Sequence, residues 1–498
     1  MQLPAVSKEI TPQQAIHSAI VEAARDVTGA LVDSAMAQAV RLMLHGSTDS
    51  TVENAPISKS SLLELPWTPL RPPQLPAGLT SPATLPPSPG ATPPPAAQAM
   101  TQRAAPMRKV LGDSAPLLRL HEKTSHLKLF VYSPPMSADW SAGNLTRRFP
   151  RCTRFQWSGD WELIQRMRKS TQAIHDGDTA DFYIVPFLSK CYYNYAAHYR
   201  LKRMNVAMRT VLSYLRLFPW WKRHPERHLF FFMSGIGAGI IPTWGAHIRQ
   251  SIFIVAEGDR EADYFREGHD IVVPGKVSTT HPRQQRPPTH RQHVAVFRGS
   301  LSAALRNADG GRVSKKNELR SWLSRTLEGE AGFIFSGQKS EHYVDEMDDS
   351  RFCIIPRGNT PWTRRFFDAV VRGCIPAVLS DPVTFPFERL IDFRRMTIKL
   401  PERWTPRIAA ELRAINDSAL TALHAGLQTL WPAFVYDVGL AFDMLLLELG
   451  ARKHGLWHSW SAATPNTARN FWSPSRGSFE IPDAKKVGAS WGAGAEPH

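Results

Sequence analysis

The most constraining part of the chain is residues 350–390, where a strand pattern, a helix pattern and a second strand pattern follow one another. Residues 351–356 form a short apolar run, residues 362–372 repeat their apolar side chains at helical spacing, and residues 374–379 form a second apolar run. A strand, a helix and a strand of these lengths predict two parallel strands joined by a crossover helix. The segment therefore predicts a parallel sheet with helices, which is the α/β class.

A polar loop, residues 357–361, joins the first strand to the helix, and Arg364 and Arg365 follow in the first helical turns. Ligands of parallel sheets bind at the carboxyl ends of the strands, where such a loop meets a helix N-terminus. Free backbone N–H groups, a helix dipole and guanidinium groups together predict a diphosphate site. An ordinary crossover unit with a solvated arginine face is the alternative that the pattern leaves open.

Several linked motifs in this segment resemble the exostosin-like glycosyltransferase family. They occur in the family's order and read Phe352-Cys353, Pro356-Arg357-Gly358, Thr363-Arg364-Arg365, Phe367-Asp368-Ala369, Gly373-Cys374-Ile375-Pro376 and Pro386-Phe387-Glu388. Weaker similarities to family strands lie at residues 127–132, 179–188 and 294–299. The resemblance therefore covers roughly residues 125–450.

The resemblance implies a GT-B fold, in which two Rossmann-like domains face each other across a cleft. It also implies an inverting glycosyltransferase that moves a sugar from a nucleotide sugar, expected to be a UDP-sugar, to a polysaccharide or glycan acceptor. Family members reside in the Golgi, whereas this chain shows neither a signal peptide nor an apolar run of membrane-spanning length. Membrane association would then need a missing or unrecognised anchor. Assembly with a different subunit is a further expectation.

Composition along the chain predicts five parts. Apolar residues recur at helical spacing within 9–45, prolines crowd residues 66–106, and strand and helix patterns alternate from about residue 120. The apolar run 431–449 predicts one long helix that returns to the first domain. The expected parts are an amphipathic helical segment (1–50), a proline-rich linker or stem (51–115), an N-terminal Rossmann-like domain on the acceptor side (116–285), a C-terminal Rossmann-like nucleotide-sugar domain with the return helix (286–475) and a tail without fixed structure (476–498).

The net charge of +16 is concentrated in two windows. Residues 198–228 hold eight Lys/Arg and one Glu, and residues 281–325 hold ten Lys/Arg and two acidic residues. Concentrated positive charge indicates an anionic partner. No zinc-finger spacing, basic zipper region or aromatic RNA-binding strand accompanies it, which disfavours nucleic acid. A basic binding module for acidic glycans and a merely solvated surface both remain open.

The chain contains four cysteines, Cys152, Cys191, Cys353 and Cys374, without any Cys/His spacing typical of zinc sites. Two fall in each predicted domain. One disulfide within each domain, as in a secretory lumen, and four buried thiols are both compatible with this distribution.

For the donor diphosphate we select Arg357, Gly358, Thr363 and Arg364, with Arg298 reaching across from the end of its strand. The arginine fork binds two phosphate oxygens at once, and guanidinium and backbone dipoles can replace a cation. We therefore expect no metal and no cofactor besides the nucleotide sugar.

Asp368 follows Arg364 by four residues and is expected either to bind the donor, to orient that arginine, or to form a structural ion pair with it. The resemblance assigns Glu388 to the ribose hydroxyls. Ser380 and Asp381 end the second strand and are expected to line the pocket.

The sequence does not identify the catalytic base. Glu257, Asp259 and His247 lie near predicted strand ends, and a glycine-rich loop, residues 234–239, follows a strand in the first domain. The His-Asp pair that many family members carry near this loop is absent from the chain. A catalytically inactive exostosin-like partner subunit is therefore the alternative to an enzyme.

Overall fold

The computed structural model describes residues 106–456 apart from 113, 155, 277–285, 302–317, 359 and 362. The expected N-terminal helical segment, nearly all of the proline-rich linker and the C-terminal tail lie outside the described residues. Within the described part, no helix has the length and apolar content needed to cross a bilayer.

The first half of the described chain forms a six-stranded sheet in the order β2-β1-β3-β4-β5-β7, with every neighbouring pair parallel. The strands are β1 Leu129–Val131, β2 Ala173–Ile174, β3 Phe182–Ile184, β4 His228–Phe232, β5 Ile252–Val255 and β7 Ile271–Val272. β1 and β3 fall within residues 127–132 and 179–188, the segments that resemble family strands. Every residue of β4 is buried, as expected where helices cover both faces of a parallel sheet.

Helices of this half connect the strands. They are α5 Ala142–Arg148, α6 Gly159–Lys169, α7 Ser189–Cys191, α8 Leu201–Leu215, α9 Pro219–Arg223 and α10 Trp244–His247. The pattern predicts a helix over 196–218, whereas α8 begins at Leu201. The delay follows from His198 and Tyr199, whose positive φ angles of 49° and 61° interrupt right-handed helix.

The second half forms a five-stranded parallel sheet in the order β13-β11-β10-β8-β9. The strands are β8 His293–Arg298, β9 Phe333–Ser336, β10 Ser350–Pro356, β11 Ile375–Leu379 and β13 Ile398–Lys399. The helices are α11 Glu318–Leu327, α12 Tyr343–Asp348, α13 Arg364–Arg372, α14 Ile408–Arg413 and α15 Asp417–Leu430. Side chains alternate along β10, since Phe352 and Ile354 join one apolar cluster and Cys353 and Ile355 the other. The α/β class with parallel sheets is confirmed.

A short antiparallel pair joins residues of the two halves: β6 (Gly258–Asp259) pairs with β12 (Val383–Thr384). Glycine is required at 258, because an added Cβ would lie 2.9 Å from the Thr384 carbonyl oxygen and 2.9 Å from Val272. The segment just after β5 of the first sheet therefore packs closely against the segment that contains Thr384.

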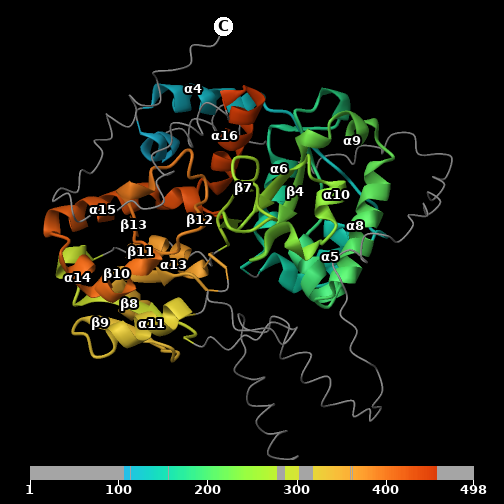
Figure 1. Cartoon of the computed structure of the whole chain (residues 1–498). Helices are drawn as coiled ribbons and strands as arrows, with labels where there is room; N and C mark the ends of the chain where they lie inside the picture. The colour runs from blue at the N-terminus through green and yellow to red at the C-terminus, as the bar shows by residue number, and fades with distance from the viewer. Residues whose placement is uncertain are drawn as a thin grey trace, which may run out of the picture. The chain divides into compact units, whose positions relative to one another are not determined.

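The prediction of one long helix over 431–449 is wrong. A 3-10 turn, Trp431–Phe434, is followed by an irregular segment and then by α16 (Ala441–Lys453). The irregular segment requires glycine at 439, because a Cβ there would collide with the carbonyl oxygens of Pro432 and Val435. Helix α16 packs against α4 (Ala115–Lys123), so the two ends of the described chain lie side by side in Figure 1.

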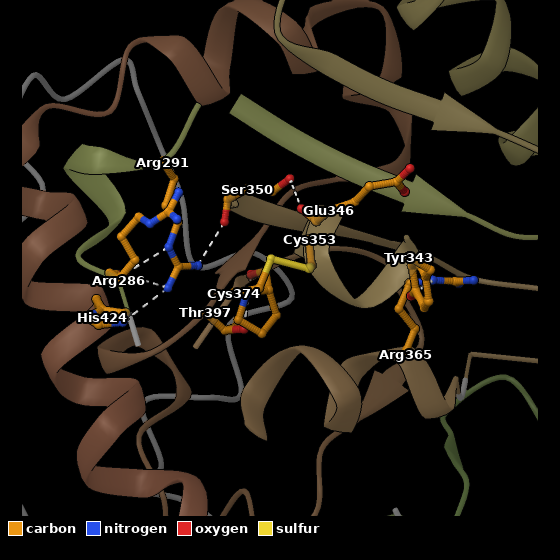
Figure 2. The surroundings of a disulfide bond; sticks show 11 residues. Arg286, Arg291, Tyr343, Glu346, Ser350, Cys353, Arg365, Cys374, Thr397 and His424 are labelled. Carbon is orange, nitrogen blue, oxygen red and sulfur yellow. Dashed lines mark hydrogen bonds between the residues drawn. A yellow bond between two sulfur atoms is a disulfide. The ribbon is translucent and has the colours of Figure 1, made fainter. Parts of the chain in front are cut away.

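The cysteines form two disulfides, Cys152–Cys191 and Cys353–Cys374, each within one half of the described chain. The second joins the parallel neighbours β10 and β11, and Figure 2 shows it between the Arg291 side chain and the Tyr343–Arg365 pair. Of the two alternatives left by the sequence, the structure shows the disulfides rather than four thiols. Such bonds persist in oxidising compartments.

Candidate functional site

Arg357 follows β10 directly and is almost fully buried, with 5% of its side chain exposed. Its Nη1 donates to Glu402 Oε1 (3.2 Å) and its Nη2 donates to Glu261 Oε2 (3.3 Å). Its Nε is buried and has no hydrogen-bond partner among the described residues. A buried guanidinium N–H without a partner is a rare feature that suits an anionic ligand.

Ser380 directly follows the neighbouring strand β11 and is also buried. Its Oγ lacks a hydrogen-bond partner among the described atoms, like Arg357 Nε. The two strand ends are joined by the hydrogen bond from Arg357 N to Leu379 O (3.0 Å). Two unsatisfied donors therefore lie at the carboxyl ends of adjacent parallel strands, the edge at which such sheets bind ligands.

Asp381 and Glu402 fix the chain beyond Ser380. Asp381 N donates to Glu402 Oε1 (2.9 Å), and Glu402 N donates to Asp381 Oδ1 (3.1 Å). The buried Lys399 donates to Asp381 O (3.2 Å), and burial lowers the pKa of Lys399 to about 8. This reciprocal pair holds the carboxylate that orients Arg357.

Helix α13 begins beside this edge, with Thr363 as its N-cap: Thr363 Oγ1 accepts a hydrogen bond from Arg365 N (3.3 Å). Arg364 is 48% exposed and its Nε pairs with Asp368 Oδ2 (3.1 Å) one turn later. The structure thus brings the predicted Thr363, Arg364 and Asp368 together on one helix. An ion pair this exposed contributes at most about 1 kcal/mol, so phosphate oxygens can replace the carboxylate.

Three other arginines near the sheet, Arg298, Arg365 and Arg320, are engaged by side chains or carbonyl oxygens of the fold. Arg298 forms an ion pair with Glu346 on α12 through two hydrogen bonds (2.9 and 2.6 Å). Its role in binding the donor diphosphate stays a prediction. Arg365 donates to Tyr343 Oη (3.1 Å) and to the Arg298 carbonyl, as part of the surroundings in Figure 2. Arg320 donates to the carbonyls of Arg357 and Ser300 (3.1 Å each).

The backbone at Gly358 approaches the Arg320 guanidinium closely, because an added Cβ would lie 3.0 Å from it. Burial lowers the pKa of Arg320 to about 10, with a smaller contribution from the charge of Arg365. These contacts hold the backbone of the loop after β10 in place. The sequence places Gly358 in the donor site, and that role stays a prediction.

Glu388 carries an ion pair between the two halves. Arg260 Nη2 donates to Glu388 Oε1 (2.6 Å), and Phe385 N donates to its Oε2 (2.9 Å). Burial raises the pKa of Glu388, while Arg260 opposes the shift. Both carboxylate oxygens are engaged, so ribose binding by Glu388, which stays a prediction, requires it to exchange one of these partners.

Glu257 is the base candidate that contacts the loop after β10. It follows β5, is 1% exposed, and its Oε2 accepts from Thr360 Oγ1 (3.1 Å). The glycine-rich loop also borders Thr360, since a Cβ at Gly235 would lie 3.4 Å from its hydroxyl. Asp259 instead caps a turn by accepting from Glu261 N (3.1 Å).

His247 lies in α10, and its pKa is lowered by burial and then by Arg216 and Arg209. The D-x-D spacing of Asp176 and Asp178 falls in a 3-10 turn, where Asp178 accepts from Trp220 Nε1 (2.8 Å). Among the residues that the structure describes, no cluster of three or more His, Cys, Asp or Glu side chains could hold a metal ion. Metal independence stays a prediction.

Asp160, in the first turn of α6, is a buried carboxyl group that the sequence does not reveal. First-turn acidic residues usually stay at the surface, but Asp160 is 2% exposed, and burial raises its pKa to about 8. Its Oδ1 accepts from Trp161 N (2.7 Å), and its Oδ2 has no partner among the described residues. The native state therefore holds this carboxyl protonated near neutral pH.

Asp160→Asn is expected to raise the free energy of unfolding by about 2 kcal/mol at pH 7.5. The substitution removes the cost of protonating a buried carboxyl group on folding, and the cost of burying the amide offsets part of this gain. The native pKa lies above the ordinary value of 3.8, so stability is lost as pH rises from about 4 towards about 8. The gain from the substitution should therefore shrink at pH 5. Denaturant unfolding at both pH values tests this, with exposed Asp178→Asn as control. A gain that does not fall at pH 5 contradicts the assignment.

A family model described as the Exostosin GT47 domain matches residues 123–415, a span that includes every strand of both parallel sheets. The chain is 24% identical over 313 residues to a probable glucuronosyltransferase of Oryza sativa subsp. japonica, covering 59% of this chain and 71% of the relative. It is 24% identical over 326 residues to a probable glucuronoxylan glucuronosyltransferase of Arabidopsis thaliana (61% and 70%). It is 22% identical over 333 residues to a probable beta-1,4-xylosyltransferase of Arabidopsis thaliana (63% and 77%).

Proposed function

Because this chain belongs to the exostosin GT47 family and is a glycosyltransferase, we propose that it transfers a sugar from a UDP-sugar to a polysaccharide, inverting the anomeric configuration. The relatives whose names specify glucuronosyl and xylosyl transfer support glucuronic acid and xylose as the first donor sugars to test. The polysaccharide acceptor rests on the relative named for glucuronoxylan.

The two parallel sheets support a GT-B arrangement, with the acceptor on the side of the first sheet and the nucleotide sugar on the second. The hydrogen bond Thr360–Glu257 joins residues that follow β10 and β5, and the ion pair Arg260–Glu388 joins residues that follow β6 and β12. A Golgi lumen suits the two disulfides, which need an oxidising compartment.

The observation that carries the proposal is the pair of unsatisfied buried donors, Arg357 Nε and Ser380 Oγ, at neighbouring strand ends. A diphosphate supplies acceptor oxygens to both, and the half-exposed Arg364 at the start of α13 adds a guanidinium. Together they stabilise the charge that builds on the leaving diphosphate as the bond between the sugar and the phosphate oxygen breaks.

Inversion requires one displacement, in which the acceptor hydroxyl attacks the anomeric carbon from the face opposite the diphosphate and loses its proton to a base. Glu257 is our choice for that base, because it is the candidate whose carboxylate reaches the loop after β10. The Thr360 hydroxyl orients it by donating to one oxygen.

The test is UDP release and product formation by the full chain with UDP-glucuronic acid and UDP-xylose, in the presence of EDTA. Glu257→Gln should lower transfer about 10²–10⁴-fold while UDP still binds. Glu341→Gln, which alters an exposed carboxylate outside these contacts, serves as control. If no UDP-sugar binds, the inactive partner subunit replaces the enzyme; if EDTA abolishes turnover, the metal-free site is wrong.

A further inference from the structure

The exposed face of α8 carries a row of basic side chains. Lys202, Arg209 and Arg216 recur every seven residues, which is two helical turns or about 10.5 Å along the axis. Val206 and Ser213 lie beside this row on the exposed side, whereas the opposite side packs into the core through residues such as Met204 and Leu212. We call Lys202, Val206, Arg209, Ser213 and Arg216 the α8 face.

Positive charge dominates the surroundings of the α8 face. No acidic residue occurs between Asp181 and Glu226 in the sequence. Within the part of the chain that the structure describes, no ion pair involves Lys202 or Arg209. The neighbouring His247 experiences the charges of Arg216 and Arg209. The face therefore presents a positive potential to solvent.

The second basic window behaves differently, although its charge is as large. Arg286 pairs with Asp349, Arg298 with Glu346, and Arg291 donates to the Ser350 carbonyl (2.9 Å), as Figure 2 shows for Arg291. These arginines are already used inside the fold. Within the window that contains α8, by contrast, Lys202 and Arg209 are exposed and form no ion pair among the described residues, so their charges can meet a partner.

We propose that the α8 face binds an acidic glycan, with the carboxylates of uronic acid residues paired to Lys202, Arg209 and Arg216. The identity of the glycan rests on the proposed function, in which the chain extends a polysaccharide. A straight row of evenly spaced cations matches an extended chain whose carboxylates repeat at regular intervals. The hydroxyl of Ser213 lies beside the row and can bind sugar hydroxyls.

A lipid surface suits the face less well. The large exposed apolar side chains within and just after α8 are three, Leu201, Val206 and Leu217, at 41%, 51% and 44% exposure. Helices that lie in membrane interfaces need a broader apolar face, because buried apolar area provides much of their affinity. The charges, rather than the apolar atoms, therefore define the ligand.

The α8 face also belongs to the first sheet, since α8 lies between β3 and β4, whereas the diphosphate site follows β10 of the second sheet. Binding here holds a long acceptor near the enzyme without contacting the donor. It should lower the KM for a long acidic acceptor and leave kcat unchanged.

The test compares the full chain with a variant that combines Lys202→Ser, Arg209→Ser and Arg216→Ser. The control variant combines Arg119→Ser, Arg147→Ser and Arg325→Ser, three exposed cations on other helices. Polygalacturonic acid is the acidic probe and dextran is the neutral probe. The lipid probe is a vesicle that contains about 30% phosphatidylserine, which gives it a clearly anionic surface. Affinity is measured without donor, at low and moderate salt, and thermal unfolding confirms that both variants fold.

We expect the face variant to bind polygalacturonic acid about 10-fold or more weakly, with a shallower salt dependence, and the control variant to bind as the parent does. If both variants bind polygalacturonic acid equally well, the proposal is overturned. It is also overturned if the face variant loses vesicle binding but still binds polygalacturonic acid as the parent does. Binding is measured without a sugar donor, so it does not depend on transferase activity. If the full chain transfers no sugar but the face variant still binds the polymer more weakly, the proposed function is rejected and the glycan-binding face is retained.

Discussion

Arg364→Ala is expected to lower kcat/KM for the UDP-sugar about 10²–10³-fold, the usual effect of removing one group that stabilises a developing negative charge. Arg364 is the first residue of α13, the helix that follows the end of β10, where Arg357 leaves its buried Nε unsatisfied. The half-exposed pair of Arg364 with Asp368 contributes little to folding, so the free energy of unfolding should change by less than about 1 kcal/mol. Steady-state kinetics and denaturant unfolding of the same preparations measure both quantities.

Arg372→Ala provides a matched control at the other end of α13. Arg372 forms an ion pair of the same length, 3.1 Å to Asp348, but lies at the helix C-terminus, away from the loop after β10. Arg364→Lys should recover part of the rate, because lysine keeps the charge and loses the fork. If Arg372→Ala impairs turnover as strongly as Arg364→Ala, the helix rather than the guanidinium is responsible.

The sequence alone predicts much of the second sheet's carboxyl edge. The helix predicted over 362–372 forms as Arg364–Arg372, with Thr363 as its N-cap. This helix, the i,i+4 pair Arg364–Asp368 and the strand before Arg357 follow from local periodicity and from contacts within one helix turn. The family resemblance is confirmed for the same reason, since its motifs are local and lie in order.

Contacts between distant segments are what the sequence cannot supply. The Thr360–Glu257 hydrogen bond joins residues 103 positions apart, and the Arg298–Glu346 pair joins residues 48 apart. The first identifies a base candidate, and the second shows how a predicted donor ligand is engaged. The burial of Asp160 also cannot be predicted from the sequence, because it depends on tertiary packing rather than on the position of the residue in a helix turn.

Gly426→Ala is expected to destabilise the protein by about 3 kcal/mol or more, although alanine in mid-helix normally gains about 1 kcal/mol over glycine. Gly426 lies within α15, where the helix crosses the 3-10 turn Phe393–Arg395. An added Cβ would lie 2.8 Å from the carbonyl carbon of Arg395 and closer still to its oxygen. Both atoms belong to the backbone, so no side-chain rotation relieves the overlap and the turn must move.

Gly245→Ala is the control, because α10 leaves open space where its Cβ would stand. It should be neutral or stabilising by up to about 1 kcal/mol in the same denaturant titration. Displacement of the turn in Gly426→Ala would also shift Glu388, five residues before it, and so weaken the Arg260–Glu388 pair between the halves. We therefore expect Gly426→Ala to lose transferase activity below its unfolding midpoint. Equal stability of the two glycine variants would show that α15 does not pack on this turn in solution.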